Sequence, residues 1–217
     1  MKKLGLALAL FATVAMGNAA LAAQPGLSAT ADNVQQETAS RDCVSVKYPS
    51  FIDTSFLRQS WMNAAIETEV SSFESYVRKL NETGSFKGYV SYEVGYVGDD
   101  WVSVILYESI MPEGAAHPST TVKGLTFDHN GYRLTRADVL SRLPAQSSAD
   151  IQNLIETQTK ARNLPIFEPK DWSIHTWPQE FYIGQDKHIY FIFQQYDIAP
   201  YAAGWISIDT GVTPDLK

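Results

Sequence analysis

The residue types that most often carry chemistry, namely histidine, cysteine and clustered carboxylates, are few and scattered in this chain. The four histidines, His117, His129, His175 and His188, form no H-x-x-x-H or H-E-x-x-H pair and have no cysteine next to them. Zinc and catalytic metal sites usually take several such ligands from short, recognisable spacings. The sequence therefore predicts no metal and no cofactor.

Residue types alone allow a Ser/His/Asp triad, made of Ser119, His117 and Asp128. No G-x-S-x-G turn presents a serine, however, and most domains contain all three residue types. The adjacent Asp99 and Asp100 would suit acid–base or metal chemistry, but paired aspartates between two strand patterns are more typical of a turn. These observations favour a protein without catalytic activity.

The residues that best fit a binding role surround two loops. His117 lies in a loop between two prolines, residues 112–118, and Pro200 and Tyr201 interrupt the most apolar part of the chain before Gly204. A proline can hold the following tyrosine outward with little conformational entropy left to lose, as an interface anchor requires. We predict partner contacts at His117, Pro200, Tyr201 and Gly204. The alternative is that Pro200 and Tyr201 only shape a turn.

The elements that must position these residues can be predicted from periodicity. A helix over about 55–80 places one apolar face at spacings of three and four, made of Met62, Ile66, Val70, Phe73, Val77 and Leu80. An edge strand at 44–48 precedes this helix, and a hairpin of 88–97 and 101–111 follows it. A strand at 120–127 then leads through a 129–131 turn into a short return strand at 132–134.

Helices are expected after Thr135, where Asp138 suits a capping box, and after Ser148. The aromatic stretch 181–208 contains two strands around a turn at 184–187, the break at 200–201, and a closing strand. The resulting fold class is α+β, with two packed sub-domains that are each an antiparallel sheet with a helix on one face.

The beginning of the chain has the three parts of a secretory signal peptide over residues 1–22. Lys2 and Lys3 precede an apolar run, and a small-residue cleavage site follows near 22–23. The run is too short for a membrane span, so a periplasmic or secreted protein is predicted. Residues 23–42 are polar without periodicity and read as a flexible leader. Cys43 is the only cysteine, so no internal disulfide is available.

The formal net charge of −7 gives no electrostatic basis for binding nucleic acid. An acidic surface suits a basic protein partner, because complementary charge speeds and orients encounter. Net acidity also simply keeps an exported protein soluble.

The order of motifs resembles a known family. It consists of GAAHP at 114–118, an Asn-Gly turn, Leu-Thr-x-x-Asp-Val-Leu at 134–140, and an aromatic strand that leads into YDIAPYAAG at 196–204. This resembles the extracellular C-terminal domain of RsiV-type proteins, the lysozyme-sensing anti-sigma factors. Residues 43–111 are similar to the PdaC-type module that precedes it, which leaves 112–217 for the RsiV-like domain.

The resemblance implies a binding module for a lysozyme-like protein. The sigma-binding and membrane segments of the regulators have no counterpart here, and the deacetylase histidine pair is missing. The expected function is therefore an exported, non-enzymatic binding protein of the cell envelope. The alternative is a small peptidoglycan-binding or peptidoglycan-modifying protein, in which Trp101, Trp172, Trp177 and Trp205 stack on sugar rings.

Overall fold

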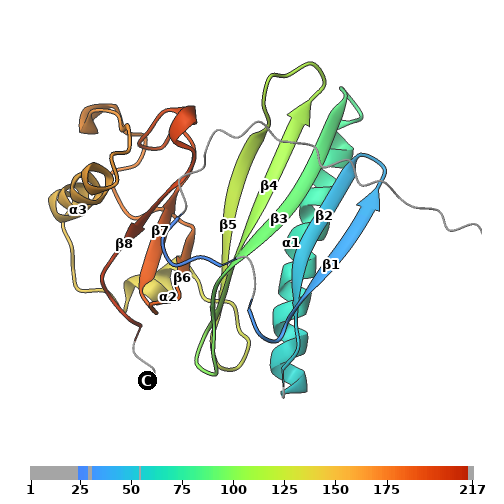
Figure 1. Ribbon diagram of the computed structural model, residues 1–217, viewed down its shortest axis with the longest axis horizontal. Coiled ribbons are helices and arrows are strands. Elements are labelled where there is room, and N and C mark those ends of the chain that lie inside the picture. Colours follow the sequence, from blue (N-terminus) through green and yellow to red (C-terminus); the bar gives the residue numbers. More distant parts are fainter. Residues whose placement is uncertain (1–23, 29–30, 54, 215–217) are drawn as a thin grey trace, which may run out of the picture.

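The structure, a computed structural model, describes residues 24–28, 31–53 and 55–214. The predicted signal peptide, residues 1–22, lies outside these residues. The described strands form two sheets, one of five strands and one of three (Figure 1). The fold class, α+β with two sheet sub-domains, is confirmed. None of the described helices has the length and apolar character needed to cross a bilayer.

The larger sheet has the order β1-β2-β3-β4-β5. Its strands are β1 (Val34–Arg41), β2 (Val44–Phe51), β3 (Phe86–Val97), β4 (Val102–Pro112) and β5 (Ser119–Phe127). Neighbours are antiparallel except β2 and β3, which are parallel because α1 (Phe56–Leu80) carries the chain back between them. The larger sheet is therefore mixed, which corrects the purely antiparallel arrangement predicted for each sub-domain.

Helix α1 covers one face of this sheet, as its periodicity predicts. Ser55 is the N-cap, and its side chain accepts a hydrogen bond from the Arg58 backbone. The predicted stripe is buried against the sheet at Met62, Ile66, Val70, Phe73 and Val77. The helix therefore anchors the core of the larger sheet.

The flexible leader predicted over residues 23–42 is wrong for the part that the structure describes. Val34–Arg41 is a full strand that pairs with all of β2, which therefore lies inside the sheet and is not the predicted edge strand. Gln24 is buried and donates a hydrogen bond to the carbonyl of Trp205. Backbone pairing needs no apolar pattern on a solvent-exposed edge strand, which is why composition did not reveal β1.

The domain boundary predicted between residues 111 and 112 lies further along the chain in the structure. Strand β5 pairs with β4 along nine residues, so the larger sheet continues to Phe127. A single backbone bridge between Phe127 and Arg133 stands where a return strand was predicted. The change from one sheet to the other thus follows β5.

The smaller sheet has the order β6-β7-β8, with β6 (Phe181–Ile183), β7 (Ile189–Phe193) and β8 (Ile206–Asp209). Helices α2 (Arg136–Leu140) and α3 (Ser148–Ala161) begin with capping boxes formed by Thr135 with Asp138 and Ser147 with Asp150. Short 3-10 helices η1 (Pro169–Asp171) and η2 (Tyr201–Ala203) complete this half. Figure 1 shows α3 on the side of the smaller sheet away from the larger one.

Strand β7 is buried on both faces because it lies between two cores. Ile189, Phe191 and Phe193 belong to the core with α3, whereas Tyr190 and Ile192 pack toward the larger sheet. Strands sandwiched in this way read as continuous apolar runs. This accounts for the aromatic density of the stretch without a functional role.

Candidate binding site

The structure stacks His117 on Tyr201, two of the residues that the sequence analysis selected. Their ring centroids are 3.9 Å apart with planes inclined by 28°. The Tyr201 hydroxyl donates a hydrogen bond of 2.9 Å to the carbonyl of Pro118. The loop before β5 and the helix η2 are thereby joined across 83 residues of sequence. The pair forms a rigid aromatic surface.

Tyr196 extends this surface. Its ring centroid lies 6.1 Å from that of Tyr201, and its side chain is 58% exposed. Its backbone has φ of +69°, an uncommon value for an aromatic residue. A tight turn holds it there, because the Asp197 carboxylate accepts a 2.6 Å hydrogen bond from the Gln194 backbone N–H. We call His117, Tyr196 and Tyr201 the aromatic platform.

One cavity lies at the platform and a second lies next to it. The first, of about 310 Å³, is lined by the three platform side chains together with hydroxyl and amide groups such as Thr120 and Gln195. The second, of about 330 Å³, also touches Thr120 and Gln195 and continues along β3 and β4. The shared residues make the two cavities neighbours along one groove.

The second cavity contains a carboxylate between aromatic rings, and we call it the Glu93 pocket. The Tyr107 hydroxyl donates a hydrogen bond to the Glu93 carboxylate. Burial and the charge of Glu93 raise the pKa of Tyr107, so the phenol keeps its proton. Trp205 forms a further wall, with its ring centroid 5.9 Å from that of Tyr107.

Pro200 and Gly204, the other two predicted contact residues, flank η2 and do not line either cavity. Pro200 precedes η2 and is half-buried, but it lines neither cavity. Gly204 is buried and ends η2 with φ of +70° and ψ of −153°, a conformation that is almost restricted to glycine. Gly204 therefore allows the chain to turn into β8 and offers no contact surface.

The structure does not bring Ser119, His117 and Asp128 together as a triad. It also does not expose the tryptophans that would stack on sugar rings. His117 and Ser119 lie at the start of β5 and Asp128 just past its end, where its carboxylate caps the turn by accepting from the backbone of Asn130 and Tyr132. The four tryptophans considered for sugar stacking are buried in the cores, at Trp101, Trp172, Trp177 and Trp205. Asp100 accepts hydrogen bonds from Tyr96 and its neighbouring backbone within the turn.

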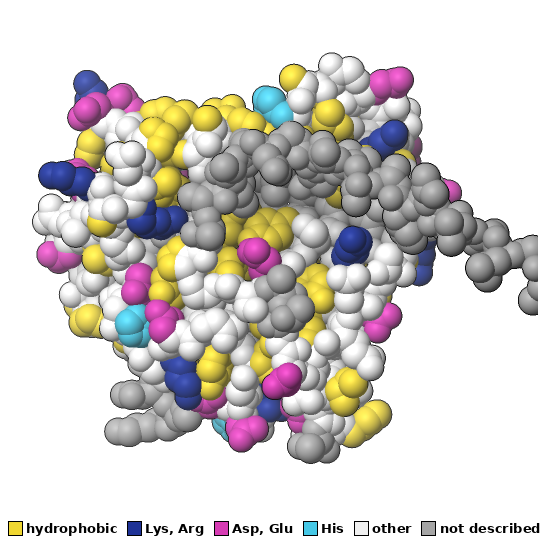
Figure 2. All heavy atoms as spheres, in the orientation of Figure 1, with side chains coloured by type: hydrophobic (Ala, Val, Ile, Leu, Met, Phe, Trp, Pro, Cys, Tyr) yellow, Lys and Arg dark blue, Asp and Glu magenta, His cyan; other side chains and the backbone are white. Residues whose placement is uncertain are grey.

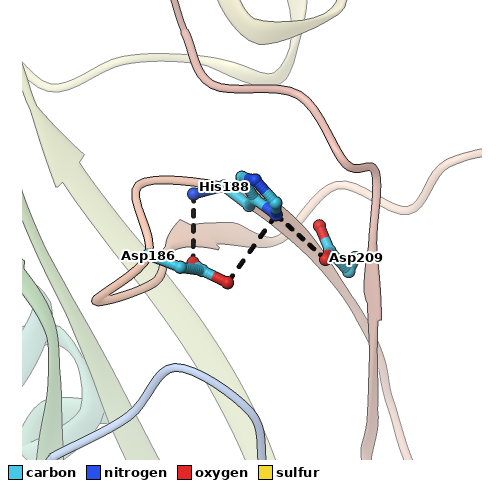
Figure 3. Close-up of side chains that lie close together, drawn as sticks. All are labelled: Asp186, His188 and Asp209. Atoms are coloured by element: carbon cyan, nitrogen blue, oxygen red, sulfur yellow. Dashed lines mark hydrogen bonds and ion pairs between the residues drawn. The ribbon is translucent and has the colours of Figure 1, made fainter.

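Asp186, His188 and Asp209 form a separate cluster at the rim of the smaller sheet (Figure 3). His188 Nδ1 is 3.0 Å from Asp209 Oδ2 and 3.6 Å from Asp186 Oδ2. The hydrogen bond to Asp209 raises the pKa of His188 above its ordinary value. The three ligand atoms lie within 4.8 Å of one another and could surround a divalent cation, but the same geometry serves a protonated imidazole held by two carboxylates.

Partly exposed charges connect α1, β5 and the residue before β6. Lys123 on β5 lies 3.9 Å from both Glu69 and Glu180, and Arg133 pairs with Glu69 at 3.1 Å. Burial raises the pKa of the neighbouring Glu108 to about 7. Lys123 and Arg133 thus pair with carboxylates from other elements in a structural network, whereas the buried Glu108 Oε1 has no hydrogen-bond partner among the described residues.

A second exposed apolar surface surrounds the start of α1. Phe56, Leu57 and Trp61 project from the helix, and Tyr132 lies 5.8 Å from Trp61 between ring centroids. Periodicity predicts only the buried face of the helix, so it did not indicate this exposed surface. The surface is separate from the aromatic platform.

One family model matches part of the C-terminal half of the chain. Residues 136–209 match the family described as "Protein of unknown function (DUF3298)". This segment is similar to the DUF3298 family. Two DUF3298 family crystal structures resemble most of the chain, one from Pseudomonas aeruginosa (TM-score 0.57, 14% identity, covering 82% of this chain and 87% of that one) and one from Bacteroides fragilis (TM-score 0.53, 14% identity, 84% and 88%). No curated protein matches the chain.

At 14% identity, these likenesses show a shared fold across both sheets. The matched segment contributes Tyr196, Tyr201 and Trp205 to the groove, whereas His117, Glu93 and Tyr107 come from the larger sheet and its loops. The groove is thus built between the matched segment and the preceding sheet.

Sequence reasoning missed Glu93, Tyr107, Gln195 and Tyr196. Glu93 and Tyr107 look like ordinary strand residues, and only their meeting on one face of β3 and β4 makes a pocket. Tyr196 lies inside the YDIAPYAAG segment, so an aromatic residue five positions before Tyr201 was the available signal.

Proposed function

We propose that this chain is a non-catalytic binding protein, exported to the cell envelope, that recognises a basic, lysozyme-like protein through the aromatic platform. The observation that carries the proposal is the His117–Tyr201 stack, held at 3.9 Å and tied to Pro118 by the tyrosine hydroxyl. Rings fixed in this way lose little entropy on binding, and rigid tyrosines are favoured interface anchors.

The charge of the chain supports a basic partner. The formal net charge is −7, and acidic and basic side chains are interspersed over the face in Figure 2. The net negative charge favours encounter with a basic protein, whereas the platform supplies the apolar contacts. The resemblance to RsiV-type domains supports the same class of partner, and the similarity of the first half to PdaC-type modules adds no chemistry to it.

The test is binding of the purified protein to lysozyme immobilised on a sensor surface. We expect Tyr201→Ala to weaken binding at least about tenfold, because truncating a central aromatic anchor costs about 2 kcal/mol or more. Tyr201→Phe, which keeps the ring but loses the hydrogen bond to Pro118, should weaken it less.

Tyr76→Ala is the matched control, because Tyr76 is an exposed tyrosine on α1 and lies outside the groove. Absence of lysozyme binding by the unmodified protein would refute the partner. Equal loss in the Tyr76 and Tyr201 variants would refute the platform.

A peptidoglycan ligand remains the second candidate, because the groove combines aromatic rings with the hydroxyl and amide groups of Thr120 and Gln195. Sedimentation with purified peptidoglycan, using the same variants, separates the two. Co-sedimentation that depends on Tyr201, without lysozyme binding, would favour the glycan.

A further inference from the structure

We infer that the Glu93 pocket receives a cationic side chain, lysine or arginine, from the bound partner. This rests on the proposed function for the identity of the partner and adds the chemical group that is recognised. The inference concerns the part of the groove beyond the aromatic platform, between β3, β4 and Trp205.

The negative charge of Glu93 favours a cationic ligand. Glu93 is half-buried, and the hydrogen bond that holds it comes from the neutral Tyr107 hydroxyl. Among residues 24–28, 31–53 and 55–214, the ion pairs do not include Glu93, whereas Asp100, Glu69 and Glu180 each have a basic partner. A partly buried carboxylate without a counter-charge is costly, and an incoming cation offsets that cost.

Aromatic residues line the Glu93 pocket. The rings of Tyr107 and Trp205 are tilted by 52° to each other and border the cavity. Ring faces attract ammonium and guanidinium groups, most strongly where water is excluded. The pocket therefore offers a cation one carboxylate and the half-buried ring of Tyr107, with the buried Trp205 behind them.

The indole of Trp205 is a further feature of the pocket. Trp205 is 2% exposed and lines the pocket, yet its indole N–H has no hydrogen-bond partner among the described residues. A buried donor left unpaired costs about 1–3 kcal/mol. Because Trp205 lines the pocket, the signal of this N–H is expected to report on a ligand bound there.

Because both cavities share Thr120 and Gln195, one segment of a partner can use them together. Its cationic side chain would enter the Glu93 pocket, and a neighbouring apolar side chain would contact the aromatic platform.

The experiment titrates the protein with small probes and follows the Trp205 indole N–H signal by NMR, assigned with Trp205→Phe. The probes are N-acetyl-lysine methylamide, its uncharged counterpart N-acetyl-norleucine methylamide, and N-acetylglucosamine. We expect saturable shifts with the lysine probe alone, and at least tenfold weaker binding of that probe to Glu93→Gln. Glu37→Gln, a charge-matched change on the exposed strand β1, should leave binding unchanged.

Equal binding of the norleucine probe, unchanged binding to Glu93→Gln, or no saturable shift with the lysine probe would overturn the inference. Because the probe comparison uses the unmodified protein, it does not depend on folding of the variant. A response to N-acetylglucosamine alone would overturn it in favour of a sugar.

The proposed pocket and the proposed partner can be refuted independently of each other. Binding of the lysine probe without lysozyme binding would leave the pocket standing and remove lysozyme as the partner. Lysozyme binding that depends on Tyr201 but is unchanged in Glu93→Gln would remove the pocket and leave the proposed function.

Discussion

At the scale of single residues, His188 shows how the fold gives one of four scattered histidines a defined electrostatic environment. Asp186 precedes it in a turn and Asp209 ends β8, so carboxylates reach Nδ1 from two segments. Asp186 is itself held by the Tyr190 hydroxyl at 2.6 Å. The result is a preference of the folded state for the protonated imidazole.

His188→Gln should therefore destabilise the protein in a pH-dependent way. The unfolded-state pKa of histidine is about 6.5 and the folded-state pKa of His188 is higher. The stabilisation by His188 is complete below pH about 6.5 and is lost as pH rises through the folded-state pKa. Urea unfolding of both proteins across this range measures the difference.

His129→Gln is the control, because His129 is exposed in the turn after β5. A stability difference for His188→Gln that stays constant with pH would contradict the ion-pair account.

At the scale of elements, the contact between β6 and the larger sheet depends on small residues. A Cβ at Gly124 of β5 would lie 1.8 Å from the Phe181 carbonyl oxygen, and one at Gly95 of β3 would lie 2.2 Å from that of Ile183. Between them, the Ser103 hydroxyl accepts a 2.9 Å hydrogen bond from the Ile183 backbone. The free edge of β6 is thereby seated on the face of another sheet.

Gly124→Ala should destabilise the protein by about 3 kcal/mol or more, since neither backbone can move away without breaking the interface. Gly114→Ala separates space from backbone strain, because a Cβ there would have no atom within 4 Å but φ is +78°. We expect about 1 kcal/mol for Gly114→Ala. Similar losses in the two variants, measured by chemical unfolding, would show that the close approach is unimportant.

At the scale of the whole molecule, side chains close the sheet edges across the two halves. The Gln194 amide bonds both the N–H and the carbonyl of Val122 on β5, and the Glu180 carboxylate accepts from the Gly124 N–H. Gln24, from the first described segment, bonds both Trp205 and Ser207. The two halves are therefore joined by side-chain hydrogen bonds at strand edges as well as by a shared core.

This sharing predicts one cooperative unfolding transition, although the groove lies between two sheets. Circular dichroism at far-ultraviolet wavelengths and tryptophan fluorescence should give the same midpoint in urea. Gln194→Ala should lower that midpoint for both probes together, because it leaves the N–H and the carbonyl of Val122 on β5 without their partner. Two separated transitions would show that the halves fold independently.

Local patterns predicted much of this fold. The helix α1, the β3–β4 hairpin and the capped starts of α2 and α3 each follow from residues close in sequence, as does the turn before β7. Strand β1 and the membership of β5 were not predictable in this way, because strand pairing is made by backbone groups of distant segments. For the same reason, Glu74 on α1 looks like a solvent-facing residue but is buried, 3.5 Å from Arg41 of β1.

The sequence by itself determined the residue types at the loops, including His117 and Tyr201, and the rigid proline that precedes the tyrosine. Only the tertiary structure decided that these rings stack, and that Glu93, Tyr107 and Trp205 meet in one pocket. The physical reason is that this pocket is made by residues that share a sheet face or an inter-sheet boundary. Such neighbours are set by strand register and by how closely β6 can approach the larger sheet, which no local pattern encodes.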